Sequence, residues 1–471
     1  MNKSSRFYVD IMAMHDEVTG SCHLVIVKLP NGETVRFVVD CGLFQEKESD
    51  ELNTMLPFKA ENVNFCLVTH VHVDHIGRLP YMVRNGFFNP IYATETTCKL
   101  LPLALNDSLR VLSSVSKRKN VHPLYSEEDV RGTLNLLKPC EYGKTIQVHE
   151  NIKVTFINNG HLVGAALIYV QISYPECEDI TLMFTGDYNN KNTFFDVAPI
   201  PQWMLETPLT VIQESTYGNI NSDQVQKCFK ENIKKCLDND GTVVVLVFSL
   251  GRSQEILYEL KNMQQAGELD MEIPIYFDGK LAIRYTELYI KDGLDINPNM
   301  RDFLPENLTF VDKGIRGELL EDTNKKIIVT TSGMGSYGPA QTYLPEYISR
   351  KNALIQFSGY TAEGTLGSRL KNTETGDMVE VGGLMTRKRA DVEYTTEYSA
   401  HAKADEMIEF LKQFKNLTLV LVNHGETNVK NIFAERIIDE VEPKRVGLLG
   451  REYFFRVNHW GLVKTLSTKF K

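Results

Sequence analysis

Several features that mark secreted, membrane-bound or nucleic-acid-coating proteins are missing from this sequence. Its eight cysteines include no Cys-x-x-Cys pair, and several fall within apolar strand patterns, so we expect reduced thiols in the core. The longest apolar runs, such as residues 243–248, are too short to span a bilayer. Residues 1–6 lead into a mixed segment without the apolar stretch of a secretory signal. We therefore expect a cytoplasmic protein with no membrane partner.

An excess of positive charge is also missing. The 51 basic and 61 acidic residues give a net charge of −10 at pH 7. This balance excludes a surface that coats nucleic acid indiscriminately by releasing counterions. It does not exclude a polyanionic substrate, because bound divalent cations would add positive charge inside the site itself.

Internal repeats, low-complexity tracts and long flexible linkers are absent as well. The 471 residues are 42% hydrophobic and 24% charged, which is typical of an ordinary globular protein. A chain of this length is too long for one ordinary hydrophobic core, so we expect two domains.

Four potential metal ligands lie within six residues of one another. His70, His72, Asp74 and His75 follow directly on the apolar run 65–68. Alternate residues of an extended segment face the same way, so the first two histidines can bind one ion while Asp74 and His75, beyond the turn, reach a second. A polar turn with surface histidines would not need this density of ligands at a strand end. The cluster predicts a metal-dependent hydrolase with two adjacent metals.

Five further apolar strands also end next to an acidic or imidazole side chain. The six strands are 35–39, 65–68, 154–157, 180–184, 209–212 and 417–422, and the residues near their ends are Asp40, His70, His161, Asp187, Glu214 and His424. Loops beyond strand ends bring such residues together on rigid supports, so we expect one site along one edge of a layered sheet.

The spacing of these strands indicates an insertion. Five of them precede residue 215 and the sixth begins at residue 417, while strands alternate with helical patterns in between. That alternation predicts a parallel sheet with right-handed crossovers. We therefore expect residues 1–215 and 395–471 to form one catalytic domain and residues 216–394 to form an inserted domain.

Six of the eleven histidines fall near the ends of these strands or, in one case, just before the last strand. They are His70, His72, His75, His161, His401 and His424. Neutral imidazole and carboxylate are the ligands expected for zinc or manganese, and a bridging carboxylate between two ions is a natural role for Asp187.

These motifs together resemble the metallo-β-lactamase superfamily, over nearly the whole chain. The resemblance rests on Asp40, HVHVDH at 70–75, NNGHLVGAA at 158–166, FTGDY at 184–188 and VNHGE at 422–426. Glu214 in ESTYG, His401 in YSAHA and His424 in HGE are similar to three additional motifs of the β-CASP branch, which comprises nucleases of RNA and DNA. The insertion resembles the same branch through VFSLGRSQEILYEL, TSGM and GYTAEGTLG. The resemblance implies an αββα sandwich with an inserted parallel-sheet β-CASP domain.

The resemblance also implies roles for individual residues. His70, His72 and His161 would hold one metal, Asp74, His75 and His424 the other, and Asp187 would bridge them. The metals would be two zinc ions, with manganese as the other option, and their bridging hydroxide would attack phosphorus. Asp40 would support a metal ligand. His401 would be the general acid oriented by Glu214, and Asp74 would serve catalysis as well as metal binding.

The last motif favours RNA as the substrate. A histidine there, His424 in this chain, accompanies RNA-directed members, whereas the branch resembling Artemis has an apolar residue. The chain is most similar to the prokaryotic RNA-processing members and the cleavage and polyadenylation endonuclease subunit. Only residues 425–471 follow His424, too few for the extra domain of ribonuclease J, so we expect endonucleolytic cleavage of single-stranded RNA.

Other activities stay open. Within the same family, a DNA nuclease or a 5′-exoribonuclease is the alternative, and hydrolysis of a small ester or thioester is disfavoured by the insertion and His401. A non-catalytic RNA-binding subunit is the alternative from another class, although such members typically lose ligands. A homodimer is compatible with the sequence.

Four residues of the insertion are candidate contacts to substrate phosphate: Ser249, Arg252, Ser332 and Gly333. The run 333–338 also fits G-x-G-x-x-G, but the prolines that follow it, and the lack of an acidic residue after the next strand, argue against dinucleotide binding. Asn190, Asn219 and Lys403 depart from the family pattern at positions that are not expected to bind metal.

Overall fold

The computed structural model describes residues 7–45, 50–175, 177–195, 197–292, 295–359, 361 and 365–467. Contacts divide the chain into a sandwich unit, Met1–Ser222 with His401–Lys471, and an inserted unit, Asp223–Ala400. The domain limits expected from the sequence, 215/216 and 394/395, stay a prediction.

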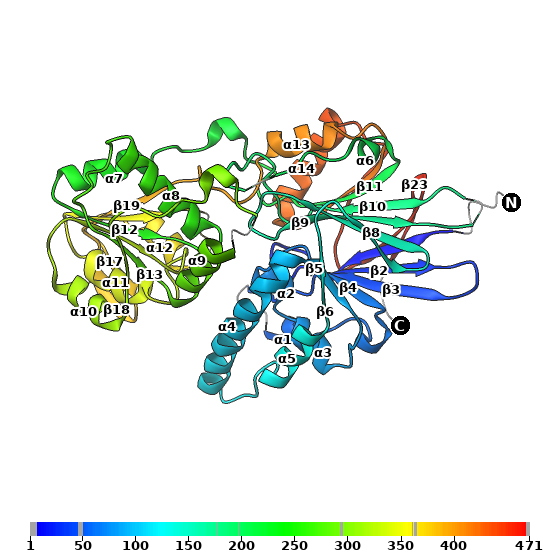
Figure 1. Ribbon diagram of the computed structural model, residues 1–471, viewed down its shortest axis with the longest axis horizontal. Helices are drawn as coiled ribbons and strands as arrows, with labels where there is room; N and C mark the ends of the chain where they lie inside the picture. The colour runs from blue at the N-terminus through cyan, green and yellow to red at the C-terminus, as the bar shows by residue number, and fades with distance from the viewer. Residues whose placement is uncertain are drawn as a thin grey trace. The chain divides into compact units, whose positions relative to one another are not determined.

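Two mixed sheets form the sandwich unit (Figure 1). The eight-stranded sheet has the order β23-β22-β1-β2-β3-β4-β5-β6, with β1 Val9–Ala13, β2 His23–Lys28, β3 Thr34–Val39, β4 Phe65–Leu67, β5 Ile91–Thr94, β6 Leu137–Cys140, β22 Tyr453–Asn458 and β23 Gly461–Ser467. The seven-stranded sheet has the order β21-β20-β11-β10-β9-β8-β7, with β7 Thr145–His149, β8 Ile152–Asn158, β9 Ala166–Ile172, β10 Ile180–Phe184, β11 Leu209–Gln213, β20 Leu417–Val422 and β21 Val446–Leu448. Strands β3 to β6 pair in parallel, as do β10, β11, β20 and β21.

Both faces of the seven-stranded sheet are buried. Leu419 and Leu421 of β20 pack into the core between the two sheets, whereas Val420 and Val422 pack into a second core against helices. Successive side chains of a strand point to opposite faces, so a strand covered on both sides needs an apolar run rather than a polar alternation.

Helices cover the outer faces of the two sheets. In the sandwich unit they are α1 Asp50–Asn53, α2 Val73–Ile76, α3 Leu79–Arg84, α4 Glu95–Lys119, α5 Glu127–Asn135, α6 Gln202–Glu206, α13 Ala404–Lys412 and α14 Thr427–Glu440, with 3₁₀ turns at Ala60–Asn62 and Ser222–Gln224. Helix α4 packs on β5 and β6, and Met407 of α13 and Phe433 of α14 pack on the seven-stranded sheet. The expected order of layers, helix, sheet, sheet, helix, is confirmed.

The inserted unit is built on a separate parallel sheet, which confirms the expected class of the insertion. Its six strands have the order β14-β13-β15-β12-β16-β19, with β12 Thr242–Leu246, β13 Ile275–Asp278, β14 Leu308–Phe310, β15 Lys326–Thr330, β16 Ala353–Phe357 and β19 Asp391–Tyr394. A hairpin, β17 Met378–Val381 and β18 Leu384–Arg387, forms a second small sheet. The helices are α7 Phe229–Asp238, α8 Arg252–Gln265, α9 Lys280–Asp292, α10 Lys313–Glu321, α11 Ala340–Tyr347 and α12 Leu366–Lys371, with a 3₁₀ turn at Pro298–Met300.

Some sequence expectations need adjustment. The strand expected at 242–248 ends at Leu246, two residues early. Of the motif at 359–367, residues 360 and 362–364 lie outside the described residues, as do residues 1–6. All eight cysteines are free, as expected. None of the helices in the described ranges combines the length and the apolar composition that crossing a membrane requires.

Candidate metal centre

Six strand ends of the sandwich unit deliver the candidate site, and they come from both sheets. In the eight-stranded sheet, β3 ends just before Asp40, and His70 follows β4 after two residues. The seven-stranded sheet supplies His161 after β8, Asp187 after β10, Glu214 after β11 and His424 after β20. The sequence placed all six on the edge of one layered sheet; the structure divides them between two facing sheets, whose ends meet at the site.

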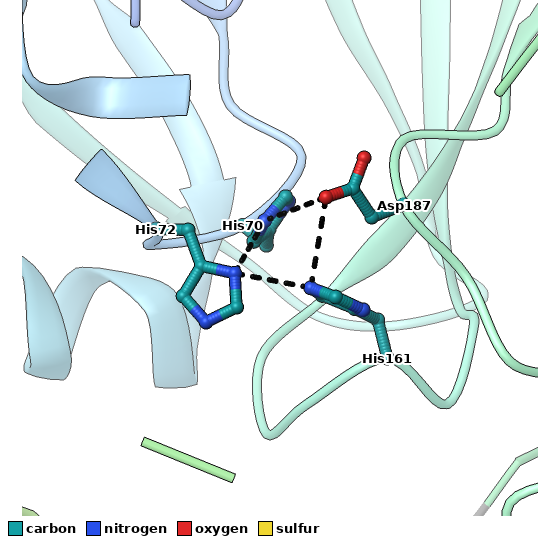
Figure 2. Close-up of side chains that lie close together, drawn as sticks. All are labelled: His70, His72, His161 and Asp187. Atoms are coloured by element: carbon teal, nitrogen blue, oxygen red, sulfur yellow. Dashed lines mark hydrogen bonds and ion pairs between the residues drawn. The ribbon is translucent and has the colours of Figure 1, made fainter. Parts of the chain in front are cut away.

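Three imidazoles and one carboxylate converge in a first cluster (Figure 2). His72 Nδ1 lies 3.2 Å from His70 Nε2 and 3.1 Å from His161 Nε2. Asp187 Oδ2 lies 3.7 Å from His70 Nε2 and 3.8 Å from His161 Nε2. Ligand atoms about 2.0 Å from a tetrahedral metal ion lie roughly 3.3 Å apart, so these four side chains fit one divalent cation.

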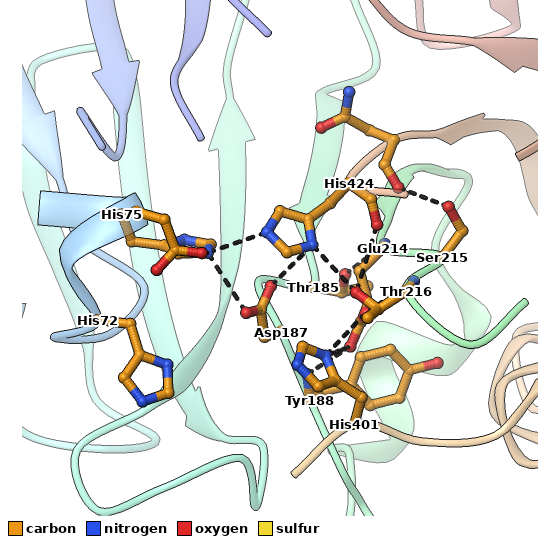
Figure 3. A network of polar contacts seen from close by, with 12 residues as sticks. His72, His75, Thr185, Asp187, Tyr188, Glu214, Ser215, Thr216, His401 and His424 are labelled. Atoms are coloured by element: carbon orange, nitrogen blue, oxygen red, sulfur yellow. Dashed lines mark hydrogen bonds and ion pairs between the residues drawn. The ribbon is translucent and has the colours of Figure 1, made fainter. Parts of the chain in front are cut away.

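A second cluster shares the same aspartate (Figure 3). His75 Nε2 lies 3.2 Å from His424 Nε2 and 3.4 Å from Asp187 Oδ2. Asp74 Oδ2 lies 3.9 Å from His75 Nε2, and Asp187 Oδ1 lies 3.3 Å from His424 Nδ1. The two oxygens of Asp187 therefore face both clusters, as a carboxylate between two cations would.

Asp187 Oδ1 supports the fit. It is buried and accepts no hydrogen bond within the described part of the chain, and His424 Nδ1 lies 3.3 Å from it. A buried carboxylate oxygen that accepts no hydrogen bond is costly, and a cation beside it would satisfy it. The donor set and this oxygen together suit divalent metal ions.

The protonation states also suit metal binding. Burial lowers the pKa of His72 to about 4 and holds the pKa of His70 well below its ordinary value, so both imidazoles are neutral at pH 7. Burial by itself would raise the pKa of Asp187, but the imidazoles of His424 and His75 outweigh it and hold that pKa well below its usual range. Metal ligands must be deprotonated, so His70, His72 and Asp187 are ready to bind. Burial by itself would lower the pKa of His75, but the carboxylates of Asp187 and Asp40 outweigh it and raise that pKa, so His75 would release its proton on binding a metal.

Asp40 orients one of the ligands. Its Oδ2 accepts a hydrogen bond from His75 Nδ1 at 2.8 Å, which leaves His75 Nε2 to face the second cluster. The same carboxylate accepts bonds from the backbone amide and the hydroxyl of Thr69, the residue before His70. Carboxylates that fix a histidine tautomer in this way are typical partners of metal-binding histidines.

Two residues at strand ends of the site have a left-handed backbone conformation. Asp40 and His424 both have positive φ, 62° and 50°, although neither is a glycine. This conformation is strained for such residues and persists only where surrounding contacts hold it. The His424 carbonyl accepts a hydrogen bond from the Ser215 amide, and the side chain of the neighbouring Asn423 accepts one from His23 Nε2. The backbone geometry therefore fixes where these two side chains point.

His401 and Glu214 form a pair beside the first cluster. His401 Nδ1 lies 3.0 and 3.1 Å from the two oxygens of Glu214, which also accept the backbone amides of Tyr188 and Thr216. The His401 ring centroid lies 5.0 Å from that of His161. Burial by itself lowers the pKa of His401, but the charge and hydrogen bond of Glu214 outweigh it and raise that pKa.

Two further residues organise the site without having been singled out in the sequence. Asn159 Nδ2 donates to the carbonyls of Thr185 and Asp187, and its Oδ1 accepts the His161 amide, so one amide ties two ligand loops together. Thr216 Oγ1 lies 3.2 Å from His424 Nδ1. Both residues lie within motifs quoted above, NNGHLVGAA and ESTYG, but no spacing rule assigns them these partners.

The four candidate phosphate contacts lie in the inserted unit, at the carboxyl ends of two neighbouring strands. Ser249 follows β12, and Arg252 begins α8; Ser332 and Gly333 follow β15, which pairs with β12. Gly333 packs against the ring of Phe248, because a Cβ there would lie 2.8 Å from it. Arg252 is buried, with Nη1 3.3 Å from a Glu255 oxygen. A role in phosphate binding stays a prediction for all four.

Models of three domain families match this chain. Residues 29–211 match a metallo-beta-lactamase superfamily domain, residues 253–370 match a Beta-Casp domain, and residues 386–446 match a Zn-dependent metallo-hydrolase RNA specificity domain. The first model spans the expected ligands from His70 to Asp187, and the second lies within the inserted unit.

Relatives match over most of this chain. Ribonuclease TTHA0252 of Thermus thermophilus is 31% identical over 87% of this chain and 91% of its own length, and an RNase J-like protein of Methanocaldococcus jannaschii is 29% identical over 89% and 94%. Endoribonuclease ysh1 of Schizosaccharomyces pombe is 27% identical over 88% of this chain but 53% of its own length. With the fold and the metal site, these similarities show that the chain belongs to the metallo-β-lactamase superfamily and, within it, to the β-CASP family.

Proposed function

We propose that this protein is a metal-dependent ribonuclease that cleaves single-stranded RNA internally, with two zinc ions in the sandwich unit. The observation that carries this proposal is the His401–Glu214 pair, which puts an acid–base group next to the His161 ring of the metal cluster. A hydrolase of small esters needs no such group on the leaving-group side. The names of the relatives, ribonuclease, RNase J-like protein and endoribonuclease, support the same substrate class.

We propose that the seven ligands divide between the two clusters. His70, His72 and His161 would hold one ion, Asp74, His75 and His424 would hold the other, and Asp187 belongs to both groups. When bound, the two ions supply a hydroxide at neutral pH and positive charge against the phosphate oxygens. Asp74, whose side chain is 18% exposed while that of His75 is 1% exposed, would accept a hydrogen bond from the attacking water.

His401 acts on the other side of the scissile bond. Because Glu214 holds Nδ1, we assign to Nε2 the transfer of a proton to the departing oxygen. Glu214 also keeps the imidazole protonated through its negative charge, so the pair combines orientation with acidity.

The rival functions make different demands. A non-catalytic RNA-binding subunit does not need its metal ligands, yet all seven residues are present and clustered here. A DNA nuclease or a 5′-exoribonuclease of the same family would use the same chemistry, so substrate experiments must separate them. We place the reaction in the cytoplasm, where the free cysteines would stay reduced, and we propose a homodimer, which light scattering on the purified protein would test.

Cleavage assays with labelled nucleic acid test the proposal directly. The metal-loaded protein is incubated with end-labelled and internally labelled single-stranded RNA and with DNA of the same sequence. We expect internal cuts in RNA and little cleavage of DNA. We expect Asp187→Ala to lose bound metal and activity together, and His401→Ala to keep its metal while kcat falls by roughly 10²- to 10⁴-fold.

His122→Ala is the matched control, because this histidine is exposed and lies outside both clusters; its activity should equal that of the wild type. Reconstitution of the metal-free protein with zinc or with manganese identifies the effective ion. An intact RNA with every metal would contradict the proposal, and faster cleavage of DNA would reverse the substrate assignment.

A further inference from the structure

A buried lysine lies behind the proposed general acid. Lys403, two residues after His401, is 4% exposed, and its Nζ lies 3.8 Å from the centre of the Tyr217 ring. The Tyr217 ring in turn meets the His401 ring edge to face, with centroids 5.9 Å apart and planes at 82°. Ammonium, phenol and imidazole therefore form a continuous stack.

Both ends of this stack are anchored by backbone hydrogen bonds. The Lys403 amide donates to Glu406 Oε2 at the start of α13, and the amides of Ala402 and Ala404 donate to the carbonyls of Tyr188 and Ile220. The Tyr217 carbonyl accepts the Ile220 amide. The backbone that carries the lysine and the backbone that carries the ring are thus both held in place, and Ile220 is bonded to both segments.

The stack joins the same two chain segments as the His401–Glu214 pair. Glu214 and Tyr217 belong to the loop after β11, whereas His401 and Lys403 belong to the segment that enters α13. The carboxylate fixes His401 at Nδ1; the phenol ring packs against the imidazole plane. A cation on the face of a desolvated aromatic ring attracts that ring, so Lys403 restrains the ring that lies against His401.

We propose that Lys403 is a positioning residue for His401, acting through Tyr217, and that it does not contact the RNA. This inference rests on the proposed ribonuclease function. Its ammonium is covered by the ring and the surrounding backbone, which is the opposite of the exposed cation that a phosphate contact requires.

Substrates that differ in their leaving group test the proposal. Cleavage of single-stranded RNA requires protonation of the departing oxygen, whereas bis(4-nitrophenyl) phosphate releases a weakly basic phenolate that needs no acid. For Lys403→Met, which keeps the length of the side chain without its charge, we expect kcat on RNA to fall about ten-fold with KM unchanged. Hydrolysis of the aryl diester and the metal content should stay at wild-type values.

Conservative variants sharpen the result. Lys403→Arg and Tyr217→Phe keep the cation and the ring face, so both should cleave RNA like the wild type, while Tyr217→Leu should resemble Lys403→Met. Adding Lys403→Met to Tyr217→Leu should cause no further loss, because both changes act along one path. Lys444→Met is the matched control: Lys444 Nζ lies 5.8 Å from the centre of the Trp460 ring, outside the metal clusters, and its loss should leave both reactions unchanged.

The possible outcomes distinguish the positioning role of Lys403 from the proposed ribonuclease function. If the wild type cleaves RNA and Lys403→Met cleaves it equally fast, the positioning role is wrong while the ribonuclease stands. Equal losses on RNA and aryl diester would mean that Lys403 supports the fold or the metals, and a rise in KM alone would make it a substrate contact; either result overturns the proposal. If Lys403→Met fails to fold, Tyr217→Leu decides by the same ratio of activities. A wild type that leaves RNA intact removes the proposed function itself.

Discussion

Two opposing effects dominate the acidity of His401, and the charges of Asp187, which raises its pKa, and of Lys403, which lowers it, add to them. Burial disfavours the imidazolium, whereas the adjacent Glu214 carboxylate favours it, and the carboxylate prevails, so the pKa of His401 is raised. A general acid is active only while it is protonated, so the pKa of His401 sets the alkaline limit of the reaction. The pH profile of the reaction therefore reports directly on the hydrogen bond between His401 and Glu214.

Replacing Glu214 by glutamine should shift that limit. Without the negative charge the pKa of His401 falls, so the imidazole loses its proton at lower pH and the alkaline limb of the kcat profile for RNA moves toward acid. At the alkaline edge of the wild-type range we expect kcat to be lower by about ten-fold or more. Steady-state rates across a pH series, at constant ionic strength and metal, provide the measurement.

Glu409→Gln serves as its control, because Glu409 is an exposed carboxylate of α13 that pairs with Lys191. Its profile should overlay that of the wild type. A Glu214→Gln profile with an unmoved alkaline limb would mean that another group supplies the proton.

At the scale of single residues, the sequence predicts which residues form the site better than it predicts their contacts. The ligands around His70 can be recognised because their spacing is local, one strand end and one turn. The contacts of Asn159 or of Lys403 with Tyr217 join distant segments, and nothing local to either residue signals the partner. Such contacts depend on how the strands pack, which no motif encodes.

Among the elements, the turn after β3 is packed unusually tightly against α2. A Cβ atom at Gly42 would lie 1.5 Å from the carbonyl oxygen of Asp74 and 2.0 Å from its carbon. The same carbonyl accepts the amide of Ser21, whose own carbonyl accepts the amide of Gly42. Only glycine leaves room for the short helix that carries Asp74 and His75.

We expect Gly42→Ala to push α2 away and to disrupt the second cluster. The folded protein should lose about 2 kcal/mol or more, because backbone cannot yield as a flexible side chain would. The metal content should fall toward one ion per chain, since the first cluster lacks ligands from α2. Denaturant unfolding and elemental analysis of the purified variant measure the two effects.

Gly317→Ala is the matched control. Gly317 lies within α10, and no atom outside the helix lies within 4 Å of the place that an alanine methyl group would take there. Alanine favours helices over glycine by roughly 1 kcal/mol, so this change should stabilise the protein slightly and leave its metals in place. A Gly42→Ala protein with full metal content and wild-type stability would disprove the steric argument.

The elements themselves were largely predictable. All six apolar strands with polar ends are present, because an apolar run bounded by turn residues predicts a buried strand whatever its partners. The sandwich of two facing sheets was expected from the family resemblance, but which strand belongs to which sheet was not predicted, because pairing partners are chosen by tertiary packing. The early end of β12 at Leu246 has the same origin: Val247 and Phe248 are apolar, but Phe248 packs against Gly333.

Over the whole molecule, hydrophobic cores are separate in the two units. One core fills the space between the sheets of the sandwich unit, and another lies under its helices. The inserted unit has a core of its own around β12, β15 and β16. The proposed metal ligands belong entirely to the sandwich unit.

Removal of the metals should therefore destabilise one unit only. An ion present at a thousand times its dissociation constant stabilises the folded state by about 4 kcal/mol, which corresponds to roughly 10 °C in the unfolding temperature. Both tryptophans, Trp203 and Trp460, lie in the sandwich unit. On adding a chelator, tryptophan fluorescence should report earlier unfolding, while calorimetry should show a second transition at its original temperature.

Restoring zinc should return the fluorescence transition to its first position, which distinguishes metal loss from damage. A chelator that shifts both transitions equally, or neither, would contradict a metal site confined to the sandwich unit.

At the scale of the whole molecule, the sequence indicated the insertion, because five polar-ended strands precede residue 215 and the sixth begins far later. The exact limits of the two units cannot be predicted from the composition of the junctions, because they depend on contacts in the folded structure.

The interruption of the sandwich unit has a consequence for synthesis on the ribosome. β20 lies inside the seven-stranded sheet, β22 pairs with β1, and both follow the insertion, as do His401 and His424. A nascent chain that has emerged as far as residue 400 exposes an open sheet edge and an incomplete ligand set. Because His424 is a proposed metal ligand, we expect no cleavage of RNA, including the message being translated, before residue 424 has been made.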